Sequence, residues 1–133
     1  MNKKELICIV CPNGCLLEAE IEEGDGIKVG EVSGSLCEKG PVWAQQELTN
    51  PVRTIASNVL VSGGDFDLVS VRTDTAIPLG RILEVMAAVK EIRVAAPVQI
   101  GDILIKNPAG TACNISATRH VKNVARVWSE PMF

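Results

Sequence analysis

The sequence predicts an α+β fold, in which a small cysteine-bearing β-hairpin module is joined to a β-rich half with one main helix. Three observations lead to this prediction. Several short stretches alternate apolar and polar residues between glycine-containing turns, as strands do. One stretch, 78–92, repeats its apolar residues with helical spacing. Four of the five cysteines fall within the first 37 residues, so the two halves differ in composition.

The bulk composition limits the possible functions. The chain has 133 residues, of which 47% are hydrophobic, so it can form a folded domain or a small module joined to another. A net charge of −3 and only 3% aromatic residues argue against a nucleic-acid partner. No apolar run suits a signal peptide or a membrane span, so a cytoplasmic protein is expected. In that reducing compartment, clustered cysteines are metal ligands or redox groups more often than disulfides.

Strand signals dominate the first half of the chain. The stretch 16–23, LLEAEIEE, alternates apolar and acidic residues, as a strand with one solvent-facing side does. The turn signal GDG follows at 24–26, and 27–32 returns as the partner strand. The loop 33–40 is rich in serine and glycine and carries Cys37. These features predict a β-hairpin beside the cysteines.

A short helix and a module boundary are expected next. Proline suits the first turn of a helix, so Pro41 predicts a helix over 41–48, which Asn50-Pro51 ends. We therefore expect a four-cysteine metal or cluster module at 1–54 and an α+β module at 55–133. The segment between them is not flexible in composition, so the two modules can share one core.

Strands and one helix are predicted in the second module. Residues 52–73 form two strands around a turn at 62–65. A helix starts near Pro78 and is capped by Asp74 or Thr75. Its apolar residues recur with i, i+3, i+4, i+7 spacing and are expected to face the core. These residues are Ile82, Val85, Met86 and Val89.

Three further stretches of the second module are expected to be strands. Residues 93–100 and 102–107 flank Gly101 and are predicted to pair with each other as a hairpin. Residues 113–121 add a strand after the next turn, and Cys113 on this strand is expected to be a small buried residue.

Four cysteines are the candidate functional residues. Cys8, Cys11 and Cys15 have the spacing C-x2-C-x3-C, and Cys37 opens the sequence CEKG. A disulfide framework suits short secreted chains, and five cysteines are an odd number. A thioredoxin-like dithiol opens a helix, which Pro12-Asn13-Gly14 prevents here. A metal site is the interpretation that uses all four thiols.

The metal site is predicted to hold a 4Fe–4S cluster, with zinc as the alternative. Four thiolates make a tetrahedral zinc site, but zinc ribbons usually supply two C-x2-C pairs, and only Cys8 and Cys11 have that spacing. A 4Fe–4S cluster takes one thiolate per iron, so the first loop supplies three ligands and the distant Cys37 supplies a fourth. Pro12 and Gly14 permit the tight turns that such a loop requires.

The first part of the chain also has a family resemblance. Its C-x2-C-x3-C motif, its Asp25-Gly26 hairpin turn and its C-x-K-G motif at 37–40 resemble the N-terminal iron–sulfur module of molybdopterin oxidoreductases, such as formate dehydrogenases and periplasmic nitrate reductases. The resemblance implies that Cys8, Cys11, Cys15 and Cys37 bind the cluster. It also implies that Lys39 lies beside the cluster and contacts a cofactor or partner. A pterin is not expected, because the large domains that bind it in those enzymes are missing.

The whole chain is similar to an uncharacterised family of small bacterial and archaeal four-cysteine proteins, and residues 96–119 contribute the C-terminal part of that likeness. Genes of that family commonly accompany FAD-dependent dehydrogenases of the anaerobic glycerol-3-phosphate dehydrogenase type. The resemblance implies an iron–sulfur electron-transfer or accessory subunit of a flavoprotein dehydrogenase, without an active site of its own. The alternative is a zinc-binding structural or interaction module.

Overall fold

The computed structural model describes residues 2–124, and its contacts divide the chain into two units, Met1–Val52 and Arg53–Phe133. Strands are the main element of both units, and within the described residues each unit contains one α-helix. The predicted α+β class is therefore confirmed. Neither of these helices has the length and apolar character needed to span a membrane.

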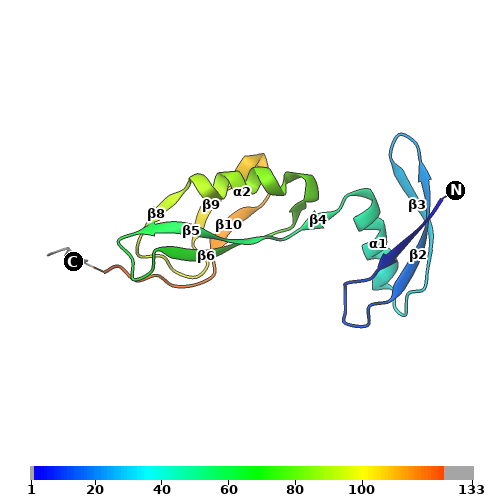
Figure 1. Cartoon of the computed structure of the whole chain (residues 1–133), viewed down its shortest axis with the longest axis horizontal. Helices are drawn as coiled ribbons and strands as arrows, with labels where there is room; N and C mark the ends of the chain where they lie inside the picture. Colours follow the sequence, from blue (N-terminus) through cyan, green and yellow to red (C-terminus); the bar gives the residue numbers. More distant parts are fainter. Residues whose placement is uncertain (1, 125–133) are drawn as a thin grey trace, which may run out of the picture. The chain divides into compact units, whose positions relative to one another are not determined.

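The first unit is a three-stranded antiparallel sheet with a helix packed against it (Figure 1). Its strands are β1 (Asn2–Ile7), β2 (Leu16–Glu23) and β3 (Ile27–Ser33), with β2 in the centre. The predicted hairpin of β2 and β3 is confirmed. Strand β1 has no counterpart in the prediction, because most of its side chains are exposed and its sequence does not alternate. Its backbone nevertheless pairs with β2 along its whole length.

Alternation along β2 builds the small core of the first unit. Leu17 and Ala19 are fully buried and Ile21 is nearly so, while the side chains between them are partly or fully exposed. Helix α1 (Lys39–Thr49) packs Ala44 and Leu48 against these residues. The helix starts two residues earlier than predicted and ends, as predicted, before Asn50-Pro51.

The second unit is a mixed five-stranded sheet with helix α2 (Ile82–Glu91) on one face (Figure 1). The strand order is β8-β5-β6-β10-β9, and only the β8–β5 pair is parallel. The strands are β5 (Ala56–Ser62), β6 (Leu68–Thr73), β8 (Arg93–Ala95), β9 (Ile103–Lys106) and β10 (Asn114–Ala117). The short strands β4 (Val52–Arg53) and β7 (Ile77–Pro78) pair with each other, and 3-10 turns span Leu79–Arg81 and Pro108–Gly110.

The predicted hairpin of residues 93–100 and 102–107 is wrong. Strand β8 lies at one edge of the sheet beside β5, whereas β9 lies at the other edge beside β10. Gly101 does form a turn, with a φ of +90°, and Val98 makes an isolated bridge with Val121. The turn signal is local, whereas the pairing partner of each strand is decided by residues far away in the sequence.

The predicted capping of α2 by Asp74 or Thr75 is also wrong. Asp74 Oδ1 accepts a hydrogen bond from the backbone N–H of Asn114 at 2.8 Å, so this side chain links the end of β6 to β10. Strand β7 and a 3-10 turn follow, and α2 begins only at Ile82. An aspartate that precedes a helix in sequence can accept a hydrogen bond from a backbone N–H at the end of a strand instead of one in the first turn of the helix.

The core of the second unit lies between α2 and one face of its sheet. Val85 and Val89 of α2 are fully buried, and Ile82 and Met86 are half-buried, so the predicted helical stripe is confirmed. Cys113 is completely buried in this core, as predicted. The strand residues that share this core with α2 are Val59, Val61, Val69, Val71, Ile115 and Ala117.

Candidate functional site

The first three cysteines occupy the loop between β1 and β2. Cys8 directly follows β1, and Cys15 directly precedes β2. The backbone N–H of Cys8 donates to the carbonyl of Cys15 at 2.8 Å, which closes the base of the loop. Cys8 is buried, Cys15 is half-buried and Cys11 is exposed. Gly14 has a φ of +60°, so the tight turn expected in this loop is confirmed.

The loop that carries Cys37 leaves the same end of the sheet. It starts at the end of β3, where Ser33 pairs with Glu18, the third residue of β2. A Cβ on Gly34 would lie 2.2 Å from the carbonyl oxygen of Leu16, so only glycine lets the loop pass this close to the start of β2. Neighbouring antiparallel strands run in opposite directions, so the end of β3 and the start of β2 lie at the same end of the first unit's sheet.

Cys37 lies immediately before Glu38, the N-cap residue of α1. The pKa of its exposed thiol is lowered, first by hydrogen bonds from the backbone N–H groups of Lys39 and Gly40, and then by the Ser35 hydroxyl and the charge of Lys39. Ser35 Oγ also donates to the Cys37 carbonyl at 2.5 Å. The thiolate is the form of cysteine that binds metals, so this helix end favours Cys37 as a ligand.

The four cysteines lie at one end of the first unit, but their thiols do not form a metal site in this structure. Within residues 2–124, no three side chains of His, Cys, Asp or Glu are grouped so that they could hold a metal ion. The donor set itself fits a 4Fe–4S cluster or zinc, because the loops 8–15 and 34–37 contain four thiols and no carboxylate. That these four cysteines bind one metal group stays a prediction. Cys113 lies in the second unit, with its Sγ 3.3 Å from Thr111 Oγ1.

Exposed apolar side chains surround the cysteine loops. The segments 6–17 and 32–37 contain no charged residue. The exposed apolar side chains here and in the first turn of α1 are Ile7, Ile9, Val10, Leu16, Leu36 and Val42, and Leu36 is 81% exposed. Isolated exposed apolar residues are common, whereas a group of them at one end of a unit is typical of interaction surfaces. The uncharged run 6–17 is the feature of the sequence that indicates this surface.

An apolar hollow of about 520 Å³ lies beside the cysteine loops. Its lining consists of Val10, Glu38, Lys39, Val42, Trp43 and Gln46. Val10 lies between Cys8 and Cys11, and Lys39 is the first residue of α1. Lys39, which the sequence resemblance implies is beside the metal group, therefore lines a hollow that both cysteine segments border.

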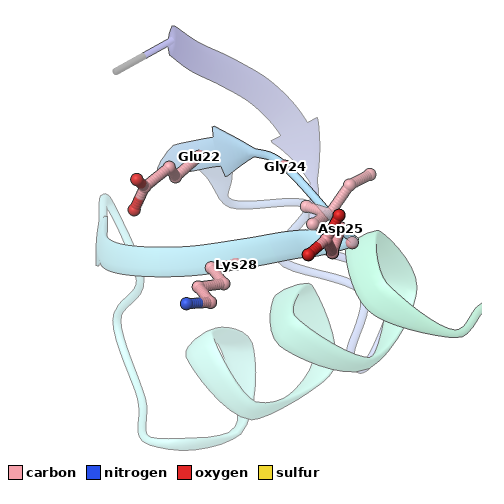
Figure 2. A pocket seen from close by; sticks show the side chains of 6 residues that line it. Glu22, Gly24, Asp25 and Lys28 are labelled. Atoms are coloured by element: carbon pink, nitrogen blue, oxygen red, sulfur yellow. The ribbon is translucent and has the colours of Figure 1, made fainter.

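A second hollow lies at the opposite end of this sheet, in the turn between β2 and β3 (Figure 2). Figure 2 shows the side chains of Glu22, Asp25 and Lys28 around it. Strand β2 separates this turn from the cysteine loops by about 25 Å, given a rise of about 3.3 Å per residue. The Asp25-Gly26 turn is therefore part of the hairpin and does not belong to the cysteine site.

Comparisons with known proteins identify a family without an assigned activity. The family described as "Protein of unknown function (DUF1667)" matches residues 38–119, a range that begins directly after Cys37. No curated protein matches the chain. The NMR structure of Clostridium perfringens protein CPE0013, a structural-genomics target, is 15% identical; the match covers 63% of this chain and 98% of that chain, with a TM-score of 0.48. Neither description names an iron–sulfur, molybdopterin or flavin enzyme.

Proposed function

This chain belongs to the DUF1667 family of proteins of unknown function, and we propose that it is an iron–sulfur electron-transfer or accessory subunit of a flavoprotein dehydrogenase. In this proposal Cys8, Cys11, Cys15 and Cys37 bind a 4Fe–4S cluster. The observation that carries it is that both cysteine loops leave the same end of the first unit's sheet. When bound, the cluster supplies a centre that accepts or donates one electron at a time.

The residues around the thiols favour metal binding in two ways. The hydrogen bond between Cys8 and Cys15 holds the base of the loop closed, so less conformational freedom is lost when a metal group binds. The lowered pKa of the Cys37 thiol favours its thiolate, which reduces the cost of removing a proton before ligation. Both effects support a metal site and apply to zinc as well as to iron.

The apolar surface around the loops supports the part of the proposal that concerns a protein partner. The centre of a protein–protein interface is depleted in charged residues, as are the segments 6–17 and 32–37. Electron tunnelling falls steeply with distance, so a flavin in the partner must come close to the metal group. An uncharged, exposed end of the first unit permits such an approach, with the hollow beside Lys39 as part of the contact.

Protein purified without oxygen is expected to be brown and to contain iron and acid-labile sulfide in about equal amounts. The measurement is iron, zinc and sulfide per chain, after anaerobic isolation and after anaerobic reconstitution. Preparation must exclude air, because exposed clusters oxidise and are lost. One zinc per chain without sulfide under these conditions would overturn the electron-transfer proposal and support the zinc-binding interaction module.

Replacing Lys39 with alanine is expected to slow reduction of the anaerobic protein by a reduced flavoprotein about three- to tenfold, with no change in iron content. The reason is that Lys39 lines the hollow formed by Val10 of the first cysteine loop and by residues 38–46. Stopped-flow absorbance measures the rate, and Lys28→Ala removes the same charge at the opposite end of the sheet as a control. A shifted potential or a lower iron content in Lys39→Ala would mean that Lys39 acts on the thiolates instead.

A further inference from the structure

The second unit has an open sheet face opposite α2. Side chains alternate along strands, so the residues between the buried valines point away from the core. Within the described part of the second unit, the one α-helix, α2, packs on the other side of the sheet (Figure 1). The open-face residues of the three central strands include Asn58, Leu60, Leu68, Ser70, Arg72 and Ser116, all of which are exposed or half-buried.

The open face carries positive charge. None of the five strands contains an aspartate or a glutamate. Arg72 lies on this face of β6, and Arg93 of β8 pairs with Leu60 and so shares the face. The second unit as a whole has nine basic and seven acidic residues, whereas the first has four basic and nine acidic residues. The open face is therefore a basic surface on a chain whose net charge is −3.

Two hollows lie on the open face, and a hydrogen bond between two hydroxyl groups connects their linings. One, of about 330 Å³, is lined by Asn58, Phe66, Asp67, Leu68, Ser70 and Arg119. The other, of about 310 Å³, is lined by Arg72, Ile100, Gly101, Ser116, Ala117 and Thr118. Thr118 Oγ1 donates to Ser70 Oγ at 2.7 Å, which joins the two linings. Ser70 accepts in this bond, so its own hydroxyl proton can be donated to a ligand.

An arginine lies on each side of this hydroxyl pair. Arg72 pairs with Ser116 across the β6–β10 ladder and lines one hollow. Arg119 follows Thr118 in the chain and lines the other hollow, with its guanidinium 3.9 Å from the centroid of the Phe66 ring. Stacking on the ring restricts the guanidinium to one side of the hollow. Asp67 is the one acidic residue among the described linings of the two hollows.

We propose that this open face binds a small molecule that carries an oxyanion, either phosphate or carboxylate, between Arg72 and Arg119. Guanidinium groups bind both kinds of anion through paired N–H donors, and the hydroxyls of Ser70 and Ser116 add further donors. Phe66, Leu68 and Ile100 in the same hollows contact the apolar part of the ligand. The site lies in the second unit and is independent of the cysteine site and of the function proposed for it.

The test is a titration of the full chain, kept reduced, with pyrophosphate, inorganic phosphate and citrate in turn at constant ionic strength. Backbone amide NMR signals of Ser70, Arg72, Ser116 and Thr118 are expected to shift and to saturate, while signals of the first unit stay unchanged. Tighter binding of pyrophosphate than of citrate assigns a phosphate ligand, and the reverse order assigns a carboxylate. Shifts that grow linearly without saturation, or that spread over both units, overturn the proposal.

Variants separate a specific site from general attraction to a basic surface. Arg72→Gln and Arg119→Gln each remove a positive charge from the site and are expected to weaken anion binding about fivefold. Asp67→Asn removes a negative charge and is expected to strengthen anion binding about twofold. Lys90→Gln is the matched control, since it removes one positive charge from α2 on the other side of the sheet. Equal weakening by Lys90→Gln and Arg72→Gln would overturn the proposal. Thermal unfolding of each variant confirms that it is folded.

Discussion

Replacing Cys11 with alanine is expected to lower the iron content of anaerobically prepared protein at least about tenfold. Cys11 is exposed in the β1–β2 loop and contributes nothing to the core, so the metal-free fold is expected to be unaffected. A cluster that loses one of four thiolates has an iron open to solvent and is expected to be lost more readily. The measurements are iron and sulfide per chain, together with the thermal midpoint of the metal-free protein.

The matched control for Cys11 is Cys113, which carries the same thiol in a different place. Cys113 is completely buried in the second unit, so Cys113→Ala is expected to lower the thermal midpoint through the cavity that it leaves. Its iron content is expected to equal that of the unmodified protein. Full iron content in Cys11→Ala would show that Cys11 is not a ligand, and the four-cysteine assignment would then be wrong.

Gly34→Ala is expected to lower the free energy of unfolding of the first unit by about 3 kcal/mol. Gly34 has a φ of +93°, which residues with a Cβ rarely adopt. The added Cβ would also lie 2.2 Å from the carbonyl oxygen of Leu16 and 3.3 Å from its carbon. Both are backbone atoms of β2, so the clash is relieved only by moving the loop that carries Cys37. We therefore expect Gly34→Ala to lose iron as well as stability.

The control for Gly34 lies in the hairpin turn at the other end of the same sheet. A Cβ on Gly26 would meet no atom within 4 Å, so Gly26→Ala is expected to change the free energy of unfolding by less than about 0.5 kcal/mol. Urea unfolding followed by circular dichroism measures both variants. If Gly34→Ala unfolds at the same urea concentration as Gly26→Ala, the close approach of the Cys37 loop to β2 is not part of the folded protein.

Elements with a local signal were predictable from the sequence. The alternation of Leu17, Ala19 and Ile21 with acidic residues predicts β2, because a strand with one buried face needs that period. The spacing of Val85 and Val89 predicts α2 in the same way. In both cases a short segment contains the whole pattern, and the apolar residues of that pattern are the ones that are buried in the core.

Elements that depend on distant partners were not predictable. Strand β1 is formed by backbone pairing with β2, and its side chains carry no strand pattern. Strand β8 pairs with β5 in parallel, and nothing in the sequence around Gly101 distinguishes this from a hairpin with β9. Asp74 follows the preferences of a helix cap but bonds to the backbone of Asn114, which lies 40 residues away.

In the candidate site, too, the local features were predictable from the sequence and the long-range ones were not. The spacing of Cys8, Cys11 and Cys15 indicates a metal-binding loop, and the C-x-K-G motif suggests Cys37 as the fourth ligand. Both loops leave one end of the sheet because of the register of β1, β2 and β3. The spacing of the cysteines in the sequence does not specify that register. Arg72 lies in β6 and Arg119 lies in the segment that follows β10, so no sequence motif links the two arginines.

The strand order of the second unit has a consequence for synthesis of the protein. Strands β5 and β6 are consecutive in the chain, whereas the helix that covers them and the strand that pairs with β6, β10, come later in the chain. Until residues 82–91 and 114–117 leave the ribosome, Val59, Val61, Val69 and Val71 have no core to enter. The first unit has no such delay, because all its elements lie within its first 49 residues. We therefore expect the valines of the nascent second unit to stay exposed until long-range pairing completes its sheet.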